Sequence, residues 1–384
     1  MHSPSPTSSP LLLSWAEINL KALESNIEYL KTQAQAPFFI MVIKANAYGH
    51  GMLELATELD DNQTVNAFAV ARIEEALQLR AAGISKRIIV LSGVISSADL
   101  SLCAAHQLEA VIHNPITAQH WCQTLHENTA SQAACHIWLK VNTGMNRLGL
   151  NQEQFTQVEN TILQAPNALT CDKLCGIMSH FSSSEDVTNQ QNVQQKSVFN
   201  FFIHSALLQH FPSAKLCLSN SGGILYHPDS HHNAVRSGIS CYGLPPGNDE
   251  QLAQHLQPVM RLKSRIIAIH ALNTGDSAGY NEQFIAQKPS TLATVAIGYG
   301  DGYPRAVTNG TAVYVNGETA AIAGRVSMDL ISIDISGLSH VAIGDEVELW
   351  GEHISCDTLA KQCQTISYEL VTRVSQRVKR VLIK

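Results

Sequence analysis

Charged side chains are scarce in this sequence. Asp, Glu, Lys and Arg make up 15% of its 384 residues, whereas hydrophobic residues make up 45%. An intrinsically disordered chain combines low hydrophobicity with high charge, so this composition excludes one and supports a sizeable folded core. At roughly 150 residues per domain, the length favours two domains, or one large domain and a smaller one.

An excess of basic residues is also missing. The chain has 25 Lys and Arg against 32 Asp and Glu, a formal net charge of -7. Nucleic-acid-binding proteins depend on Lys and Arg to neutralise phosphates. We therefore expect no nucleic-acid partner, and a small metabolite fits better as the ligand.

Long hydrophobic runs are absent. No segment approaches the ~18 to 20 apolar residues that a membrane-spanning helix needs. The Ser- and Pro-rich residues 1–10 lack the basic stretch of a secretory signal, and Leu11–Leu13 is too short for its apolar core. We expect a disordered N-terminus over residues 1–10, no membrane partner and a cytoplasmic location.

The cysteines show no disulfide framework. There are nine, an odd number, and all of them lie after residue 100. Scattered thiols of this kind are typical of a reduced, cytosolic protein. Cys171, Cys175 and His180 come nearest to a metal motif, but their spacing matches no zinc pattern, so no metal site is predicted.

From residue 15 the sequence alternates short apolar runs with segments of helical spacing. Eight strand–helix units over roughly 230 residues favour a (β/α)8 barrel over a doubly wound sheet of five or six strands. We place the barrel domain at residues 11–255. The expected strands are Phe38–Ala45, Asn66–Ala71, Arg87–Gly93, Glu109–His113, His136–Thr143, Leu174–Phe181, Lys215–Ser221 and Ala234–Gly243, and helices are expected at Leu53–Leu59, Ile73–Ala82 and Ser197–Gln209.

The pattern changes after about residue 255, where turn residues rather than helices separate the strand-like runs. Asn316-Gly317, between Val-Tyr-Val and Glu-Thr-Ala, is the strongest hairpin signal in the chain. We therefore predict a mostly β domain over residues 256–384. Its expected strands are Val259–Ala271, Thr291–Gly298, Thr311–Val315, Thr319–Ala323, Leu330–Ile335 and Glu346–Trp350.

Lys44 follows the apolar run Phe38–Ile43 at the end of the first barrel strand. Reactive residues of barrel enzymes lie at the carboxyl ends of the strands. A lysine that closes an apolar run is costly unless it is used, and a desolvated amine of lowered pKa is the nucleophile of Schiff-base chemistry. The alternative is a surface lysine with only its aliphatic part buried.

Two adjacent loops are suited to hold a phosphate group. Residues 219–223, Ser-Asn-Ser-Gly-Gly, end the seventh strand, and residues 236–239, Arg-Ser-Gly-Ile, belong to the eighth. Glycines and small hydroxyls at a helix start expose N–H groups to anions, and barrels often bind phosphate at this place. The alternative is that they are helix caps and close-packing glycines.

Residues 298–302 are also rich in glycine, but they do not match the dinucleotide-binding pattern G-x-G-x-x-G. We therefore do not predict a dinucleotide site there.

A Schiff-base lysine and a phosphate site in one barrel indicate one of two kinds of enzyme. One is a sugar-phosphate aldolase, and the other uses pyridoxal 5'-phosphate (PLP), an aldehyde that carries its own phosphate. The pattern alone leaves both open.

The sequence resembles the alanine racemase family. Residues 44–51 are similar to that family's PLP-lysine motif, and six further motifs are spread over nearly the whole chain. The resemblance implies a PLP barrel followed by a β domain, in a homodimer whose active sites are each built from both chains. It also implies that L- and D-alanine are interconverted to supply cell-wall peptidoglycan. The six further motifs are Trp15–Ile18, Lys140–Gly149, Arg236–Ile239, Tyr299–Arg305, Gly324–Asp329 and Ile366–Glu369.

The resemblance implies two catalytic bases. Lys44 would hold PLP and then act as the base on one face of the substrate Cα, and Tyr280 of the neighbouring subunit would act on the other. Two bases on opposite faces are what inversion of Cα needs. Because the ordinary pKa of tyrosine is about 10, nearby positive charge must lower it for Tyr280 to act at neutral pH.

The resemblance also implies the cofactor contacts. Arg236 would face the pyridine nitrogen of PLP and, because arginine stays protonated, would keep that nitrogen unprotonated. The ring is then a weaker electron sink, which favours return of the proton to Cα over transamination. The other implied contacts are Tyr48, Ser221, Gly238, Ile239 and Tyr368 at the phosphate, Asn220 in the same loop, and His180 against the ring.

Arg147 and Met328 would bind the substrate carboxylate, the first by its side chain and the second by its backbone N–H from the other subunit. Lys140 resembles a lysine that is carbamylated in many family members, where the carbamate orients the arginine. A bound chloride is the alternative source of that negative charge. Two residues depart from the family pattern: Asn142 stands where Asp is usual, and Asn281 where Gly is common.

Two other functions remain open. One is a racemase of broader specificity that acts on serine or other small amino acids. The other is a PLP-binding protein without turnover, which the predicted β domain disfavours because such proteins are typically single barrels.

Overall fold

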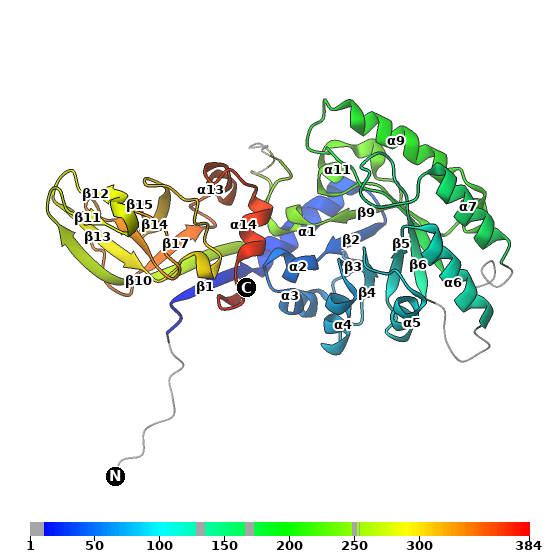
Figure 1. Ribbon diagram of the computed structural model, residues 1–384, viewed down its shortest axis with the longest axis horizontal. Coiled ribbons are helices and arrows are strands. Elements are labelled where there is room, and N and C mark those ends of the chain that lie inside the picture. Colours follow the sequence, from blue (N-terminus) through cyan, green and yellow to red (C-terminus); the bar gives the residue numbers. More distant parts are fainter. Residues whose placement is uncertain (1–10, 128–134, 166–172, 248–251, 253) are drawn as a thin grey trace, which may run out of the picture. The chain divides into compact units, whose positions relative to one another are not determined.

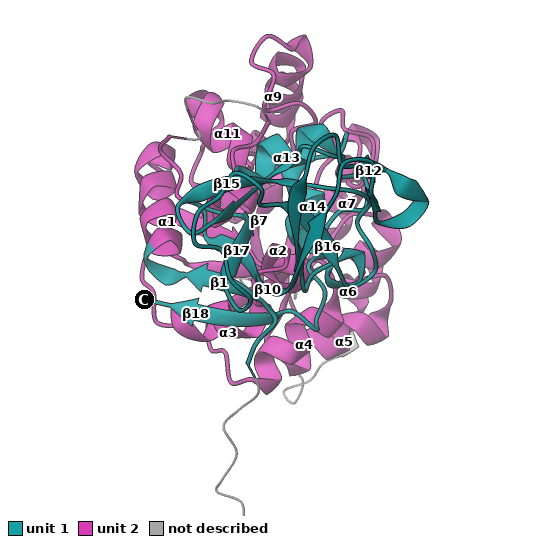
Figure 2. Cartoon of the chain, turned by 90° about the vertical axis from the view of Figure 1, so that its left-hand side faces the viewer, with its two compact units in different colours: residues 1–21, 258–384 teal, residues 22–257 magenta. Residues whose placement is uncertain are grey.

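The computed structural model describes residues 11–127, 135–165, 173–247, 252 and 254–384. The predicted disordered segment 1–10 lies outside the described residues. The chain divides into two compact units, Ala22–Gln257 and Met1–Lys21 with Pro258–Lys384, which are coloured separately in Figure 2. No helix in the described part of the chain has the length and apolar content to cross a membrane.

The larger unit is a (β/α)8 barrel (Figure 1). Its strands are almost continuous apolar runs, as expected for parallel strands buried on both faces. All eight predicted strands are present, and each ends before its predicted carboxyl end because the chain turns away earlier. They are β2 (Phe38–Val42), β3 (Ala67–Val70), β4 (Arg87–Val90), β5 (Glu109–Ile112), β6 (His136–Lys140), β7 (Leu174–Met178), β8 (Lys215–Cys217) and β9 (Ala234–Ser237).

Parallel pairing runs from β2 through to β8, and β9 pairs with β2 on the other side. The Arg236 N–H donates to the Ser219 carbonyl at 3.0 Å, which links β9 to the loop after β8 and closes the ring. Ile40, Val111 and Trp138 are among the side chains that fill the barrel interior. The carboxyl ends of all eight strands therefore meet at one mouth.

Helices cover the barrel strands. Two predicted helices are confirmed to within one residue, but the predicted helix Ser197–Gln209 is wrong as a single element. The chain forms two helices there because Ser205 is extended, with φ -68° and ψ 154°, and starts the second one. The helices are α1 (Leu20–Ala34), α3 (Met52–Leu59), α4 (Ile73–Ala81), α5 (Ser97–Ala105), α6 (Pro115–Glu127), α7 (Gln152–Leu163), α9 (Gln190–Ile203), α10 (Ala206–His210) and α11 (Ser221–Tyr226).

The other unit is mostly β, as predicted. Its main sheet has the order β13-β16-β15-β14-β17-β10-β1-β18, and β13 also pairs with β10. Its elements are β1 (Ser14–Asn19), β10 (Met260–Leu272), β11 (Ser277–Ala278), β12 (Phe284–Ile285), β13 (Ser290–Val295), β14 (Ala312–Val315), β15 (Glu318–Ile322), β16 (Ile331–Asp334), β17 (Glu346–Trp350), β18 (Lys379–Ile383), α13 (Cys356–Gln362) and α14 (Ser367–Arg373).

The domain boundary differs from the predicted one at the N-terminus. Strand β1 pairs antiparallel with β10 and parallel with β18, so residues before Ala22 belong to the β unit and not to the barrel. Trp15 and Ile18 of β1 are buried there. The sequence prediction assumed that each domain is continuous, and a first strand that joins a later sheet leaves no local signal of doing so.

The Asn316-Gly317 hairpin is confirmed. It joins β14 to β15, with Val315 paired to Glu318. Asn316 and Gly317 have φ of 49° and 90°. Positive φ at both central positions is what a type I′ turn requires, and Asn-Gly meets this requirement at the lowest cost.

Candidate active site

Lys44 lies at the mouth of the barrel, directly after β2 and the buried Ile43. Its side chain is half-buried. Burial, helped by the positive charges of Arg147 and Arg236, lowers the pKa of the Lys44 amine, while Glu75 opposes this. A lowered pKa leaves more of the amine neutral and nucleophilic. This environment suits a reactive amine better than a surface lysine.

The chain after Lys44 forms a left-handed helical turn, α2 (Lys44–Tyr48). Residues 45–48 all have φ between 53° and 55°. Each such residue costs roughly 1–2 kcal/mol for an L-amino acid, so other contacts must hold the turn in place. One of them is Glu75, whose Oε1 accepts from the Ala45 N–H at 2.7 Å. The turn ends the strand earlier than predicted and directs Tyr48 towards β9.

Loops that follow β2, β8 and β9 meet beside Gly238. A Cβ at this position would lie 2.4 Å from the Tyr48 hydroxyl oxygen, so only glycine allows this close approach. The Gly238 N–H donates to the Ser221 hydroxyl at 3.2 Å, and that hydroxyl lies 3.0 Å from the Ser237 hydroxyl. Three hydroxyls and a backbone N–H therefore gather at the predicted phosphate site.

Helix α11 and the 3-10 turn η2 (Ile239–Tyr242) both begin at this place. Asn220 caps α11, because its Oδ1 accepts from the Gly223 N–H at 2.9 Å. The structure thus gives the Asn220 side chain a capping role. The first N–H groups of a helix have no partner within it and attract anions. Both helix starts add N–H donors to the hydroxyls around Gly238.

Arg236, on β9, is buried inside the barrel and 5% exposed. It donates to the Cys217 and Ser179 carbonyls and, at 2.6 Å, to Nδ1 of His180. Burial and the charge of Arg236 hold the pKa of His180 well below its ordinary value, so His180 is neutral and its Nδ1 can accept. Among the described residues no carboxylate pairs with Arg236.

Lys140 and Arg147 lie at the two sides of the loop after β6. Lys140 ends the strand and is 9% exposed, and the Leu150 N–H closes the loop on its carbonyl at 2.9 Å. Burial, followed by the charges of Arg236, Arg147 and Lys44, lowers the pKa of Lys140 to about 7. Arg147 is exposed, and its guanidinium has no hydrogen-bond or ion-pair partner in the part of the chain that the structure describes. Its planar fork is therefore free for a carboxylate.

Four cations thus share the mouth of a barrel in a chain whose net charge is -7. Like charges held close together are costly for a folded protein, although Glu75 offsets part of the charge at Lys44. Such repulsion is expected at a site for anionic ligands, because a bound anion offsets it. We call these four residues, Lys44, Lys140, Arg147 and Arg236, the cation cluster.

The cation cluster predicts how stability depends on pH. The pKa of Lys140 is about 7 in the folded chain, whereas the ordinary pKa of lysine is 10.5, so between these values the unfolded chain binds the extra proton. Stability of cofactor-free protein should therefore rise with pH across this window, by a few kcal/mol from this group alone. Urea unfolding of the parent and of Lys140→Met in CO2-depleted buffers checks this. The slope should be smaller in Lys140→Met and unchanged in Lys361→Met, an exposed control.

Asn142 is used within its own loop. Its Oδ1 accepts from the N–H groups of Gly144 at 3.0 Å and Asn146 at 3.1 Å, and its Nδ2 donates to the Asn146 Oδ1 at 2.8 Å. Neither Lys140 nor Arg147 is among these partners. Asn142 therefore supplies no negative charge to Lys140 or Arg147.

Sequence reasoning missed Gln195, a buried polar residue of α9. Its Oε1 accepts from the Ser182 N–H at 2.9 Å, and its Nε2 donates to the His180 carbonyl at 2.9 Å and the Thr143 hydroxyl at 3.1 Å. It thereby ties the loop after β6 to the loop after β7, which carry Arg147 and His180.

A signal for Gln195 does exist in the sequence. It lies four and seven residues before Phe199 and Phe202, which mark the buried face of α9. A lone amide on an apolar helix face needs a partner. Glu75 was missed for a different reason: it lies in the first turn of a helix, where acidic residues are common.

Tyr280, Met328 and Tyr368 lie in the β unit, and their relation to the barrel residues stays a prediction. Tyr280 begins a short 3-10 turn, η3 (Tyr280–Glu282), and is 68% exposed; Met328 is 54% exposed. Asn281 has φ 58°, in the left-handed region. Asn tolerates this region better than most residues, so Asn281 can replace glycine there.

Residues 298–302, the glycine-rich segment that does not match the dinucleotide-binding pattern, have a structural role in the β unit. The Gly300 N–H donates to the Met328 carbonyl at 2.8 Å. Arg377 joins Asp301 of this segment, at 2.8 Å, to Asp329 beside Met328, at 2.7 Å. These contacts fix the Met328 loop.

Family models match both domains of the chain. The family model of the alanine racemase N-terminal domain matches residues 18–246, and that of the C-terminal domain matches residues 259–382. The alanine racemase of Shewanella sp. (strain ANA-3) is 39% identical over 364 residues, which are 94% of this chain and 97% of that protein.

Solved structures are similar over nearly the whole chain. The biosynthetic alanine racemase of Pseudomonas aeruginosa has a TM-score of 0.85 at 32% identity, covering 97% of this chain and 100% of that one. The alanine racemase of Bartonella henselae, solved with covalently bound pyridoxal phosphate, has a TM-score of 0.85 at 30% identity, with the same coverage. With both of its domains and nearly its full length matched, the chain belongs to the alanine racemase family.

Proposed function

We propose that this protein is a PLP-dependent racemase that interconverts L-alanine and D-alanine. The observation that carries the proposal is the barrel mouth itself. There a lysine amine of lowered pKa lies with Lys140, Arg147 and Arg236, and beside them hydroxyls and N–H groups surround Gly238. Membership of the alanine racemase family supports the same reaction.

The residues present fit PLP. Lys44 would hold its aldehyde carbon, and Tyr48, Ser221, Gly238 and Ile239 would hold its phosphate, joined by Tyr368. Arg236 would face the ring nitrogen, because it is buried and has no carboxylate partner among the described residues. When bound, PLP supplies the electron sink that makes the substrate Cα acidic.

The chain's own groups would then bind the substrate and move its proton. Arg147 would hold the carboxylate with its free fork, together with the Met328 N–H from the partner subunit. Lys44 would take or return the Cα proton on one face, and Tyr280 of the partner on the other.

A coupled assay tests the proposal. Protein saturated with PLP is given L-alanine, and D-alanine is measured with a D-amino acid oxidase, while L-serine is run in parallel. D-alanine should form much faster than D-serine. Comparable rates would indicate a racemase of broader specificity. No D-amino acid at all, from protein that does bind PLP, would support the non-catalytic alternative.

The homodimer is part of the proposal, and active-site complementation tests it. Inactive Lys44→Ala and Tyr280→Phe chains are unfolded or dissociated together and reassociated. If each site takes its lysine from one chain and its tyrosine from the other, a heterodimer should have one site with both defects and one intact site. Heterodimers that form, by mass spectrometry, but recover no activity would contradict the shared site.

Carbamylation of Lys140 is also proposed. A pKa of about 7 leaves about half of the amine neutral near pH 7, so it can react with CO2, as an ordinary lysine rarely can. The carbamate would give Arg147 the anion that Asn142 does not supply. Intact mass and electron density should show one CO2 unit on Lys140. A spherical anion beside an unmodified amine would instead indicate chloride, although one Asn142 amide hydrogen is already used. Finding neither would refute the charge argument.

Supply of D-alanine for peptidoglycan and a cytoplasmic location complete the proposal. The eight cysteines that the structure describes are all free thiols, which is consistent with a reducing compartment. Fractionation of the source cells would test the location.

A further inference from the structure

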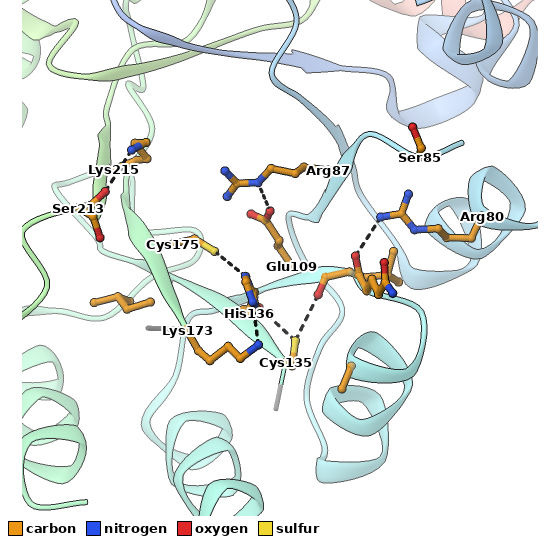
Figure 3. Close-up of a pocket in the computed structure, with 14 residues that line it drawn as sticks. Arg80, Ser85, Arg87, Glu109, Cys135, His136, Lys173, Cys175, Ser213 and Lys215 are labelled. Atoms are coloured by element: carbon orange, nitrogen blue, oxygen red, sulfur yellow. Dashed lines mark hydrogen bonds and ion pairs between the residues drawn. The ribbon is translucent and has the colours of Figure 1, made fainter. Parts of the chain in front are cut away.

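A pocket lies at the end of the barrel opposite to Lys44. It has a volume of about 580 Å3 and is lined by the first residues of β4 to β8, including Arg87, His136 and Lys215 (Figure 3). Lys44 and the cation cluster lie instead where the strands end. The volume is within the range of small-molecule sites. Because barrel enzymes perform their chemistry at the carboxyl ends of the strands, the racemase reaction gives this pocket no task.

The pocket is lined by four Lys or Arg side chains, one histidine and one carboxylate. Figure 3 shows Arg87, His136, Lys173 and Lys215 arranged around Glu109. That carboxylate is fully engaged: its Oε1 pairs with Arg87, and its Oε2 accepts from Trp138 Nε1 at 2.7 Å. Glu109 thus neutralises Arg87 and leaves the lysines uncompensated.

Arg80, the fourth cation, is held by the backbone. Its guanidinium donates to the carbonyls of Ile84, Lys86, His106 and Gln107, at 2.6 to 3.0 Å. Four of its five N–H donors are therefore satisfied, and among the described residues no carboxylate lies in ion-pair reach of it. Arg80 adds to the positive potential of the pocket without being a ligand itself.

Lys173 and Lys215 still have donors to offer. Lys173 Nζ lies 2.9 Å from His136 Nε2, and Lys215 Nζ donates to the Ser213 carbonyl at 3.1 Å. An ammonium has three donors, so two remain on each. Within the described ranges of the chain, neither lysine has a carboxylate in ion-pair reach. Both are half-buried, which limits screening by water.

The positive charges converge although they come from separate strands. Arg87 of β4 and Lys215 of β8 both lie over the Phe38 ring, at 4.8 and 5.9 Å from its centroid. The two cysteines of the pocket cannot offset them, because the pKa of each thiol is raised and keeps it protonated: that of Cys135 by a hydrogen bond with Cys103 and by burial, and that of Cys175 by burial and Glu109. A positive cavity in a chain of net charge -7 is thus a local feature.

We propose that this pocket binds a small polyanion, a metabolite that carries two or more phosphate or carboxylate charges. Lys173 and Lys215 would donate to it, with Arg87 beside them and Arg80 adding charge behind. A charged molecule of this size fits both the volume and the positive balance. The inference is independent of the racemase reaction.

Isothermal titration calorimetry with pyrophosphate and with citrate tests the proposal on PLP-saturated protein at constant ionic strength. A Kd of about 1 mM or lower is expected for at least one of the two probes. Lys173→Gln and Lys215→Gln should each weaken binding about tenfold or more, because each removes a charged donor. Lys215→Arg should retain most of the affinity, because it keeps the positive charge. The relative affinity for the two probes shows whether phosphate or carboxylate chemistry is recognised.

Two controls separate this pocket from other anion sites. Lys288→Gln removes the same charge from an exposed position and should leave the affinity within about twofold, since exposed charges are well screened. Lys140→Gln removes a cation from the barrel mouth and should also leave it unchanged. Affinity lost in Lys140→Gln but kept in Lys173→Gln would overturn the proposal, as would no binding of either probe by folded parent protein.

Discussion

Lys44→Ala is expected to reduce racemisation by about 10^4-fold or more, in both directions, because it removes the covalent attachment and one catalytic base together. Since L- and D-alanine have equal free energies, no variant can slow net conversion in one direction only. The loss should be seen equally by D-alanine formation from L-alanine and by the reverse assay. Exchange of the Cα proton with solvent deuterium should also fall from both enantiomers.

Lys86→Ala is the matched control. The pKa of Lys86 is also lowered by burial, but this residue precedes β4 at the amino ends of the strands, away from the mouth. It should retain activity near that of the parent. Substantial activity in folded Lys44→Ala protein would show that another amine performs the chemistry.

Tyr280→Phe is expected to lower racemisation by about 10^2- to 10^4-fold, the usual contribution of a positioned acid or base. The equal free energies of the enantiomers hide which base is lost, so isotope exchange must show it. D-alanine should still exchange its Cα proton with solvent deuterium through Lys44, without inversion, while exchange from L-alanine should nearly stop. Proton NMR of each enantiomer, incubated separately in D2O, measures this.

Tyr314→Phe serves as the control for Tyr280→Phe. Tyr314 is a half-buried tyrosine of the same unit, and its ring centroid lies 3.8 Å from that of His353, on which it stacks. Removal of its hydroxyl should leave both exchange rates unchanged. Equal losses of exchange from both enantiomers in Tyr280→Phe would contradict the assignment of one base to each face.

Local patterns predicted much of this fold. The eight barrel strands are buried apolar runs, and the Asn316-Gly317 hairpin has a turn signature of its own, so neither depends on the rest of the chain. Strand β1 could not be placed this way, because its partners are two strands more than 200 residues away in sequence. The left-handed turn over residues 45–48 was also hidden, because it contains no glycine.

Sequence reasoning named residues of the candidate site, but it did not predict how they interact. Motifs identified Lys44 and Arg236, whereas the 2.6 Å contact of Arg236 with His180 arises only when the barrel brings β9 and the loop after β7 together on either side of β8. The same holds for Gln195, whose partners lie 13 to 52 positions away in sequence. Electrostatic neighbours of this kind set the pKa values of the site, and no local pattern reports them.

The central claim is that Lys44, in the cation cluster of the barrel mouth, holds the cofactor. Borohydride reduction of PLP-loaded protein, followed by proteolysis and mass spectrometry of the peptides, tests it most directly. A pyridoxyl group is expected on Lys44, in the peptide that contains residues 44–51, and none on the surface control Lys361. A pyridoxyl group on Lys140 or on any other lysine, with Lys44 unmodified, would contradict the account.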